Sequence, residues 1–199
     1  LLMHHILNKP RQYLLVHDTD MLTLRQEVDY FKAIKKLKQG LPLQHITNMQ
    51  EFMKLNFYVS QDVLIPRPDT EILVEEVINI AKKIRAKKIL DLCTGSGAIA
   101  VSLAKYIEDS QITATDISEK ALRVAKLNAK NNDVEDKITF IKSDLFKEIP
   151  KEKYDIIVSN PPYIRKEEIE RLDREVKKEP HIALDGGEDG LDFYKKIID

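Results

Sequence analysis

The residues best suited to chemistry lie in one short stretch, Asn160-Pro161-Pro162-Tyr163. It directly follows an apolar run, residues 154–158, that is typical of a buried strand. Two consecutive prolines stiffen the backbone and supply no N–H group, so the carbonyls of Asn160 and Pro161 keep fixed directions. The Asn160 amide adds an acceptor, and Tyr163 adds an aromatic face. These groups suit a planar nitrogen, in a carboxamide or a nucleobase amine, whose two N–H bonds need two acceptors.

A second stretch, residues 91–97, reads Asp-Leu-Cys-Thr-Gly-Ser-Gly and also follows a predicted strand. Its glycines let the backbone approach a ligand closely and open the N-terminus of a helix. Alone, this stretch does not identify the ligand. Gly95, Gly97 and Ala100 also satisfy the relaxed fingerprint of dinucleotide-binding folds.

Two carboxylates follow the next two predicted strands. Asp116 ends one strand, where it can accept hydrogen bonds from both hydroxyls of a ribose, as in dinucleotide folds. Asp144 follows the other strand and either accepts from an adenine amine or caps its own loop. Residues 160–163 distinguish a methyltransferase from a dinucleotide-dependent enzyme. Methyl transfer to a planar nitrogen needs such a group of acceptors, whereas hydride transfer does not. The matching cofactor site disfavours a mere proline-rich surface loop there.

From residue 88 the sequence alternates between short apolar runs and amphipathic segments. This alternation predicts an α/β Rossmann-like fold, with parallel strands, right-handed crossovers and ligands at the carboxyl ends of the strands. The last strand is apolar enough that we expect it to be buried on both faces. The predicted strands are 89–92, 112–115, 138–141 and 155–158, and the predicted helices are 98–107 and 119–130.

The first part of the chain has a different pattern. Residues 1–40 read as short helices and predict a small all-α domain, whose third helix begins at Thr23 as N-cap and ends before Gly40. Residues 41–66 predict a β-hairpin linker, and 67–199 a third unit. The hairpin strands are expected at 44–47 and 55–59.

The backbone at the start of the third unit is expected to be stiff, because Pro66 and Pro68 flank Arg67. We expect Asp69 or Thr70 to cap the following helix. The side chains expected to be buried on this helix are Leu73, Val77, Ile80 and Ile84.

Composition excludes several classes of function. The formal net charge of −1 gives no global attraction to nucleic acid or to an anionic membrane. The single Cys93 excludes an internal disulfide and fits a reducing compartment such as the cytoplasm. No apolar run approaches the roughly 20 residues of a transmembrane helix. His4, His5 and His17 lack a matching cluster of ligands, so no metal site is expected.

The sequence resembles the HemK/PrmC family of methyltransferases. The resemblance extends over nearly the whole chain. Two motifs are specific to the family, namely Leu-Ile-Pro-Arg-Pro-Asp-Thr-Glu at 64–71 and Glu-Pro at 179–180 with the glycine-rich segment 183–191. The stretches 91–100 and 160–163 are general to amino-methyltransferases.

The resemblance implies a class I methyltransferase sheet that binds S-adenosylmethionine. It implies methylation of the glutamine in the Gly-Gly-Gln motif of class I peptide-chain release factors, with these factors as partners. Cys93 stands where many members have glycine, and its small side chain should fit. The implied cofactor-binding residues are Asp91, Cys93, Thr94, Gly95, Ser96, Gly97, Asp116, Asp144, Leu145 and Asn160. The glutamine would be held by Asn160, Pro161, Pro162 and Tyr163, with Asn160, Pro161 and Tyr163 acting in catalysis.

Two other functions stay open. A nucleic-acid methyltransferase acting on adenine or guanine would use the same Asn-Pro-Pro-Tyr logic, but the chain has no strongly basic stripe for phosphates. A non-catalytic module would bind S-adenosylmethionine without turnover. The family's sheet has more strands than the four predicted here, so the sequence is expected to be part of a longer protein. Taken alone, the 199-residue chain is expected to be poorly active.

Overall fold

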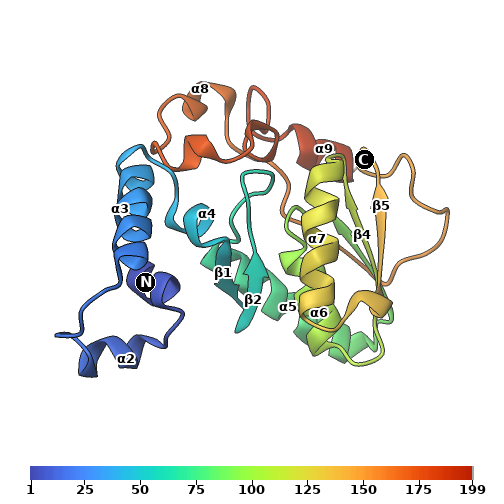
Figure 1. The fold of residues 1–199 in the computed structure, drawn as a ribbon. Coiled ribbons are helices and arrows are strands. Elements are labelled where there is room, and N and C mark those ends of the chain that lie inside the picture. The colour runs from blue at the N-terminus through green and yellow to red at the C-terminus, as the bar shows by residue number, and fades with distance from the viewer. Residues whose placement is uncertain (199) are drawn as a thin grey trace.

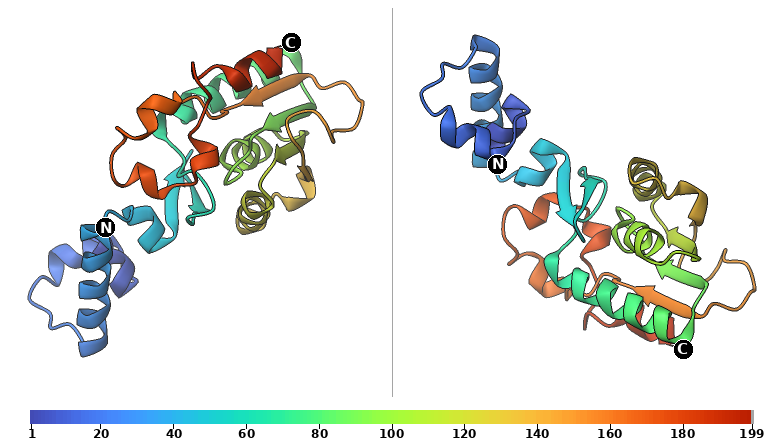
Figure 2. Two further views of the ribbon diagram at one scale, coloured as in Figure 1. Left: turned by 90° about the horizontal axis from the view of Figure 1, so that it is seen from above. Right: turned by 90° about the horizontal axis from the view of Figure 1, so that it is seen from below.

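The structure is a computed structural model that describes residues 1–198, apart from the side chain of Arg11. A four-stranded parallel sheet lies at the centre of the larger unit, with the strand order β5-β4-β3-β6. The N-terminal helices lie at the opposite end of the molecule, beyond a small antiparallel hairpin (Figures 1 and 2). The predicted fold class is therefore confirmed.

Three short helices and one longer helix, α3, make up the N-terminal part of the chain. Thr23 caps α3 as predicted, because its hydroxyl accepts from the Gln26 backbone N–H at 3.3 Å. The Gln26 side chain accepts in return from the Thr23 N–H at 2.9 Å, which completes a capping box. The helices are α1 (Leu2–Leu7), α2 (Arg11–Val16), α3 (Leu24–Lys38) and α4 (Leu43–Thr47).

The hairpin consists of β1 (Met49–Phe52) and β2 (Leu55–Tyr58). The prediction that residues 44–47 form its first strand is wrong, because they lie in α4, which starts directly after Pro42. Both turn residues, Met53 and Lys54, have positive φ, at 50° and 58°. Met53 is held from outside the hairpin: its N–H donates to Glu71 Oε1 at 2.7 Å and its carbonyl accepts from the Tyr106 hydroxyl at 2.5 Å.

Helix α5 (Pro68–Ile84) begins at Pro68, because the fixed φ of proline suits the first helical position. Arg67 occupies the N-cap position, so the prediction of Asp69 or Thr70 as the cap is wrong. The predicted buried face is also wrong in part: Ile80 and Ile84 are 40% and 53% exposed. Because α5 packs against α6 and β6, its buried residues are Val74, Val77, Ile78 and Ala81.

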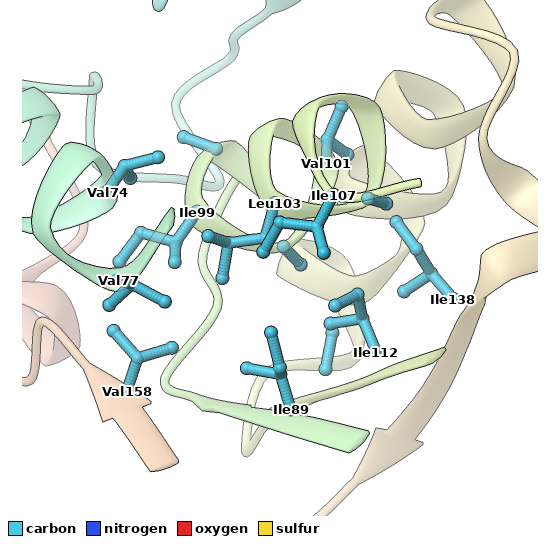
Figure 3. Packing of buried hydrophobic residues seen from close by; sticks show 14 of the residues in the cluster. Val74, Val77, Ile89, Ile99, Val101, Leu103, Ile107, Ile112, Ile138 and Val158 are labelled. Carbon is cyan, nitrogen blue, oxygen red and sulfur yellow. The ribbon is translucent and has the colours of Figure 1, made fainter. Parts of the chain in front are cut away.

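Strands and helices then alternate as predicted. The core lies between the sheet and the helices α5 and α6. There Val77 and Ile99 lie over Ile89, Ile112 and Val158 of three adjacent strands (Figure 3). The elements are β3 (Lys88–Leu92), α6 (Ala98–Tyr106), β4 (Gln111–Asp116), α7 (Glu119–Asn131), β5 (Ile138–Lys142) and β6 (Ile156–Ser159).

Strand β6 lies at one edge of the sheet, beside β3. Successive side chains of a strand point to opposite faces. Val158 is buried, whereas Ile157 on the other face is 50% exposed. The expectation that this strand is buried on both faces is therefore wrong.

The chain after β6 folds back on itself. The Ile164 N–H donates to the Leu184 carbonyl at 3.0 Å, and the Gly186 N–H donates to the Ile164 carbonyl at 2.8 Å. Across residues 1–198, no helix is long and apolar enough to span a membrane. The elements of this segment are α8 (Lys166–Ile169), the 3-10 turns η2 (Val176–Lys178) and η3 (His181–Ala183), and α9 (Asp192–Ile198).

Candidate active site

The loops that follow the parallel strands surround a cavity of about 250 Å³. The sheet register brings them together, because Leu92 at the end of β3 pairs with Thr115 of β4 and Ser159 of β6. Among residues 1–198, Asp91, Gly97, Pro161 and Tyr163 belong to these loops or strand ends without lining the cavity. The predicted site residues that do line it are Cys93, Thr94, Gly95, Ser96, Asp116, Asp144, Leu145, Asn160 and Pro162.

The loop between β3 and α6 has the left-handed backbone that its sequence predicts. Gly95 and Gly97 have φ values of 56° and 80°. A Cβ on Gly97 would lie 3.0 Å from the Ala125 Cβ, whereas one on Gly95 would meet no atom of the described chain within 4 Å. Cys93 has the same left-handed conformation, with φ at 59°. Glycine adopts this conformation without strain, which explains why many members of the resembled family have glycine at this position. Burial raises the pKa of its thiol to about 12, so the thiol stays protonated.

Asp91, in the strand β3 that precedes this loop, forms a hydrogen bond to it. The Thr94 hydroxyl donates to its Oδ2 at 2.6 Å, and the residue is fully buried. Burial raises the pKa of this carboxyl to about 7. Its other oxygen, Oδ1, accepts no hydrogen bond within residues 1–198. A buried acceptor without a partner is costly, so this atom is suited to an internal water as donor.

Asp116 lines the cavity at the end of β4. Its two oxygens accept from the backbone N–H groups of Gly95, at 2.9 Å, and Ser118, at 2.8 Å. These bonds fix the carboxylate and leave lone pairs that can accept from two hydroxyl groups. Desolvation by burial raises the pKa of the carboxyl, and the backbone donors oppose that shift.

The loop after β5 places Asp144 and Leu145 on a third side of the cavity. Leu145 is buried with φ at 52°, and its carbonyl accepts from the Ser143 hydroxyl at 2.6 Å. The Asp144 carboxylate pairs with Lys147 at 2.5 Å, and that hydrogen bond holds the pKa of Asp144 below its usual range. Asp144 thus has an internal cation as its partner besides any ligand at the cavity.

Asn160 follows β6 at the fourth side. The Ser159 hydroxyl donates to the Leu92 carbonyl at 2.8 Å and ties the end of β6 to β3. The Asn160 side-chain nitrogen donates to the Thr70 hydroxyl at 3.2 Å. Its oxygen, Oδ1, accepts no hydrogen bond from residues 1–198. Pro161 is buried, and Tyr163 is 55% exposed.

Two glycines from the C-terminal segment fix the backbone of Tyr163. A Cβ on Gly186 would lie 2.6 Å from the Tyr163 Cα, and one on Gly190 would lie 2.5 Å from the Tyr163 carbonyl oxygen. Only glycine allows so close an approach. Close packing against Tyr163 therefore explains the glycines of the motif at 183–191. The spacing of the motif alone did not indicate where it packs.

Sequence reasoning missed several residues of the site. Thr70 and Arg67 line the cavity, and Arg67 pairs with the buried Glu179. The motif at 64–71 indicated that this segment matters for function. It could not indicate which residues, about a hundred positions away, its side chains contact. The further lining residues come mostly from the segment after the hairpin and from the C-terminal segment, and they include Val63, Pro66, Pro180, Ile182, Phe193 and Lys196.

Comparisons with known proteins define the class of this chain. A model of the methyltransferase small domain matches residues 68–185, and a model of the PrmC N-terminal domain matches residues 1–47. The catalytic domain of hMettl16, solved with the MAT2A 3′UTR hairpin 6, shares the fold with a TM-score of 0.58 at 17% identity, over 87% of this chain and 61% of that one. The chain is therefore an S-adenosylmethionine-dependent methyltransferase.

Curated relatives identify the family. The release factor glutamine methyltransferase of Clostridium acetobutylicum is 46% identical over 99% of this chain and 70% of its own length. That of Clostridium botulinum is 42% identical over 100% of this chain and 71% of its own length. The chain belongs to the release factor glutamine methyltransferase family.

The residues present fit S-adenosylmethionine. Open space above Gly95 lets a ligand approach the backbone, and the Asp116 carboxylate supplies acceptors for ribose hydroxyls. A mainly apolar wall with a few polar groups is typical of small-molecule sites.

Proposed function

We propose that this chain methylates the side-chain amide nitrogen of the glutamine in the Gly-Gly-Gln motif of class I release factors. The observation that carries the proposal is the 46% identity, over nearly the whole chain, to a curated release factor glutamine methyltransferase. The open Asn160 Oδ1 at the cavity supports it, because a carboxamide nitrogen needs acceptors. The process served would be translation termination, in the cytoplasm.

The cofactor would be held by the residues around the glycine loop. Gly95 and its neighbours would contact it through their backbone, Asp116 would accept from the ribose, and Asp144 and Leu145 would border the base. When bound, S-adenosylmethionine supplies a methyl carbon activated by a positively charged sulfur. An amide nitrogen is a weak nucleophile, since its lone pair is delocalised into the carbonyl. The chain must therefore contribute positioning and electrostatics rather than a strong base.

Asn160 and Pro161 would accept the two hydrogens of the substrate amide. Asn160 Oδ1 is free for this, and the Pro161 carbonyl accepts no hydrogen bond within residues 1–198. Two acceptors on one nitrogen fix its orientation and stabilise the positive charge that develops on it. Tyr163 would pack against the amide plane, and the nitrogen would lose its proton to water afterwards.

The helical segment at residues 1–40 would recognise the protein partner. Three side chains on one face of α3 are exposed although they are apolar: Leu24, Val28 and Phe31, at 77%, 42% and 61%. They recur at four- and three-residue steps, so they form one stripe along the helix. Exposed apolar stripes of this kind favour a protein-binding role.

The test is a methylation assay with a purified, unmethylated release factor and S-adenosylmethionine. We expect a mass gain of one methylene on the peptide that contains Gly-Gly-Gln, and none when that glutamine is replaced by glutamate. Asn160→Ala should lower kcat by about 10²-fold or more, the usual cost of losing such an acceptor. Methylation of a nucleic acid in place of the factor, or cofactor binding without turnover on either, would contradict the proposal.

A further inference from the structure

Thr70 and Asn160 meet at the cavity although they lie 90 positions apart. The Asn160 Nδ2 donates to the Thr70 Oγ1 at 3.2 Å, and both residues line the cavity. Each is only partly buried, so neither needs the other to satisfy a fully buried polar group. The contact therefore calls for a reason other than stability alone.

Both residues sit on rigid elements that pack directly on each other. Thr70 lies in the first turn of α5, and Asn160 directly follows β6. Val77 of α5 lies beside Val158 of β6 in the core, and Val74 belongs to the same buried cluster (Figure 3). This packing keeps the two backbones at a fixed separation, so the hydrogen bond holds the Asn160 side chain in one place.

The local role that a threonine usually has in a first turn does not apply here. Helix α5 has no side-chain cap, and Pro68, one residue after its N-cap position, has no N–H to be capped. The Thr70 hydroxyl instead accepts from another element of the chain. Its contact with Asn160 is thus a specific feature of the site rather than part of the helix terminus.

The orientation of the Asn160 amide decides what it can bind. With Nδ2 on Thr70, the acceptor Oδ1 is the free end. The reversed amide would present two N–H donors to a substrate nitrogen that itself carries two N–H donors, and no hydrogen bond would form. A residue that binds Nδ2 of Asn160 therefore favours substrates that donate a hydrogen bond to Oδ1.

We propose that Thr70 is a positioning residue, which anchors the Asn160 amide so that Oδ1 faces the nitrogen to be methylated. This inference rests on the proposed function, because it assigns Asn160 Oδ1 to the substrate amide. In this role Thr70 acts through Asn160 and not on the reacting atoms themselves.

The experiment compares Thr70→Val, which keeps the shape and removes the hydroxyl, with Thr70→Ser, which keeps the hydroxyl. Thr139→Val, on the exposed face of β5, is the matched control. We expect Thr70→Val to lower kcat on the release factor about tenfold, as loss of one hydrogen bond does, with a smaller change in the Kd for S-adenosylmethionine. Thr70→Ser should stay within about threefold of the wild type.

A second measurement needs neither turnover nor a substitution at Thr70. In the wild-type chain, the Asn160 side-chain NH₂ should exchange with solvent more slowly than that of Asn79, which is exposed on the same helix as Thr70. Asn160→Asp assigns the resonance. Equal exchange rates, or a Thr70→Val enzyme with wild-type kcat, would overturn the inference. A wild-type enzyme that leaves the release factor unmethylated would instead overturn the proposed function, and the exchange measurement would still decide on the anchor.

Discussion

Arg67 and Glu179 form an ion pair, with Nη2 and Oε1 2.5 Å apart, across 112 positions of the chain. The Glu179 side chain is 1% exposed, whereas that of Arg67 is 37% exposed. The carboxylate also accepts from the Ile65 N–H at 2.8 Å. One buried carboxylate thus joins the approach to α5 with the segment that contains Pro180, and both segments line the cavity.

The asymmetry of this pair gives a first prediction. Arg67→Met leaves a buried carboxylate with one neutral donor, so the free energy of unfolding should fall by about 3 kcal/mol. Glu179→Gln still accepts from Ile65 and leaves an arginine that can reach water, so its cost should be nearer 1 kcal/mol. Urea denaturation measures both values. Equal losses would mean that burial of Glu179 does not dominate.

A second prediction concerns Asp116. Asp116→Ala should raise the Kd for S-adenosylmethionine about tenfold or more, because hydrogen bonds to a charged group contribute ~1.5–3 kcal/mol. Asp109→Ala, on an exposed loop, is the control. Calorimetry on both variants checks this. An unchanged affinity for Asp116→Ala would place the ribose elsewhere.

The third prediction follows from Asn128, which is completely buried in α7. Its side chain accepts from the Tyr58 N–H at 2.7 Å and donates to the carbonyls of Tyr58 and Ser96, at 2.9 and 2.8 Å. Asn128→Ala leaves these groups unpaired and should cost about 3 kcal/mol in the free energy of unfolding. Asn131→Ala, exposed on the same helix, is the control, and a comparable loss there would refute this reason.

The sequence allowed prediction of whatever depends on local pattern. Strand and helix alternation, the Thr23 cap and the residues around the glycine loop all follow from spacing and residue type. Residues 44–47 resemble a strand because Ile46 and Thr47 are β-branched, and so short a run does not distinguish a strand from one turn of helix. The buried face of α5 could not be derived from α5 alone, because β6 and α6 select it.

The remaining part of the site depends on long-range pairs. Thr70 with Asn160 and Arg67 with Glu179 bring together residues 90 and 112 positions apart. No periodicity encodes such pairs. The exposure of Ile157 likewise depends on the place of β6 at the sheet edge, which its composition does not reveal.

A fourth prediction is a pH dependence of stability. Burial raises the folded-state pKa of Asp91 to about 7 from an ordinary 3.8. Between these values the folded chain retains a proton that the unfolded chain has lost, so the contribution of Asp91 to stability falls as pH rises from about 4 to 7. Asp91→Asn removes this component, on the order of 4 kcal/mol. Denaturation of both proteins at pH 5 and pH 8 should therefore show a smaller difference for the variant, and identical differences would contradict the raised pKa.

The last prediction tests the exposed stripe on α3. The opposite side of this helix faces α1, with Ala33 buried, so Leu24, Val28 and Phe31 are turned away from the fold. If they contact the release factor, Phe31→Ser should lower kcat/KM for the whole factor about tenfold or more, since a buried aromatic residue at an interface typically contributes over 1 kcal/mol. The Kd for S-adenosylmethionine should not change, because the cavity lies in the other unit. Lys36→Ser, exposed on another face of α3, is the matched control. A wild-type kcat/KM for Phe31→Ser would remove this stripe from the recognition surface, whereas equal losses in both variants would point to unfolding of α3.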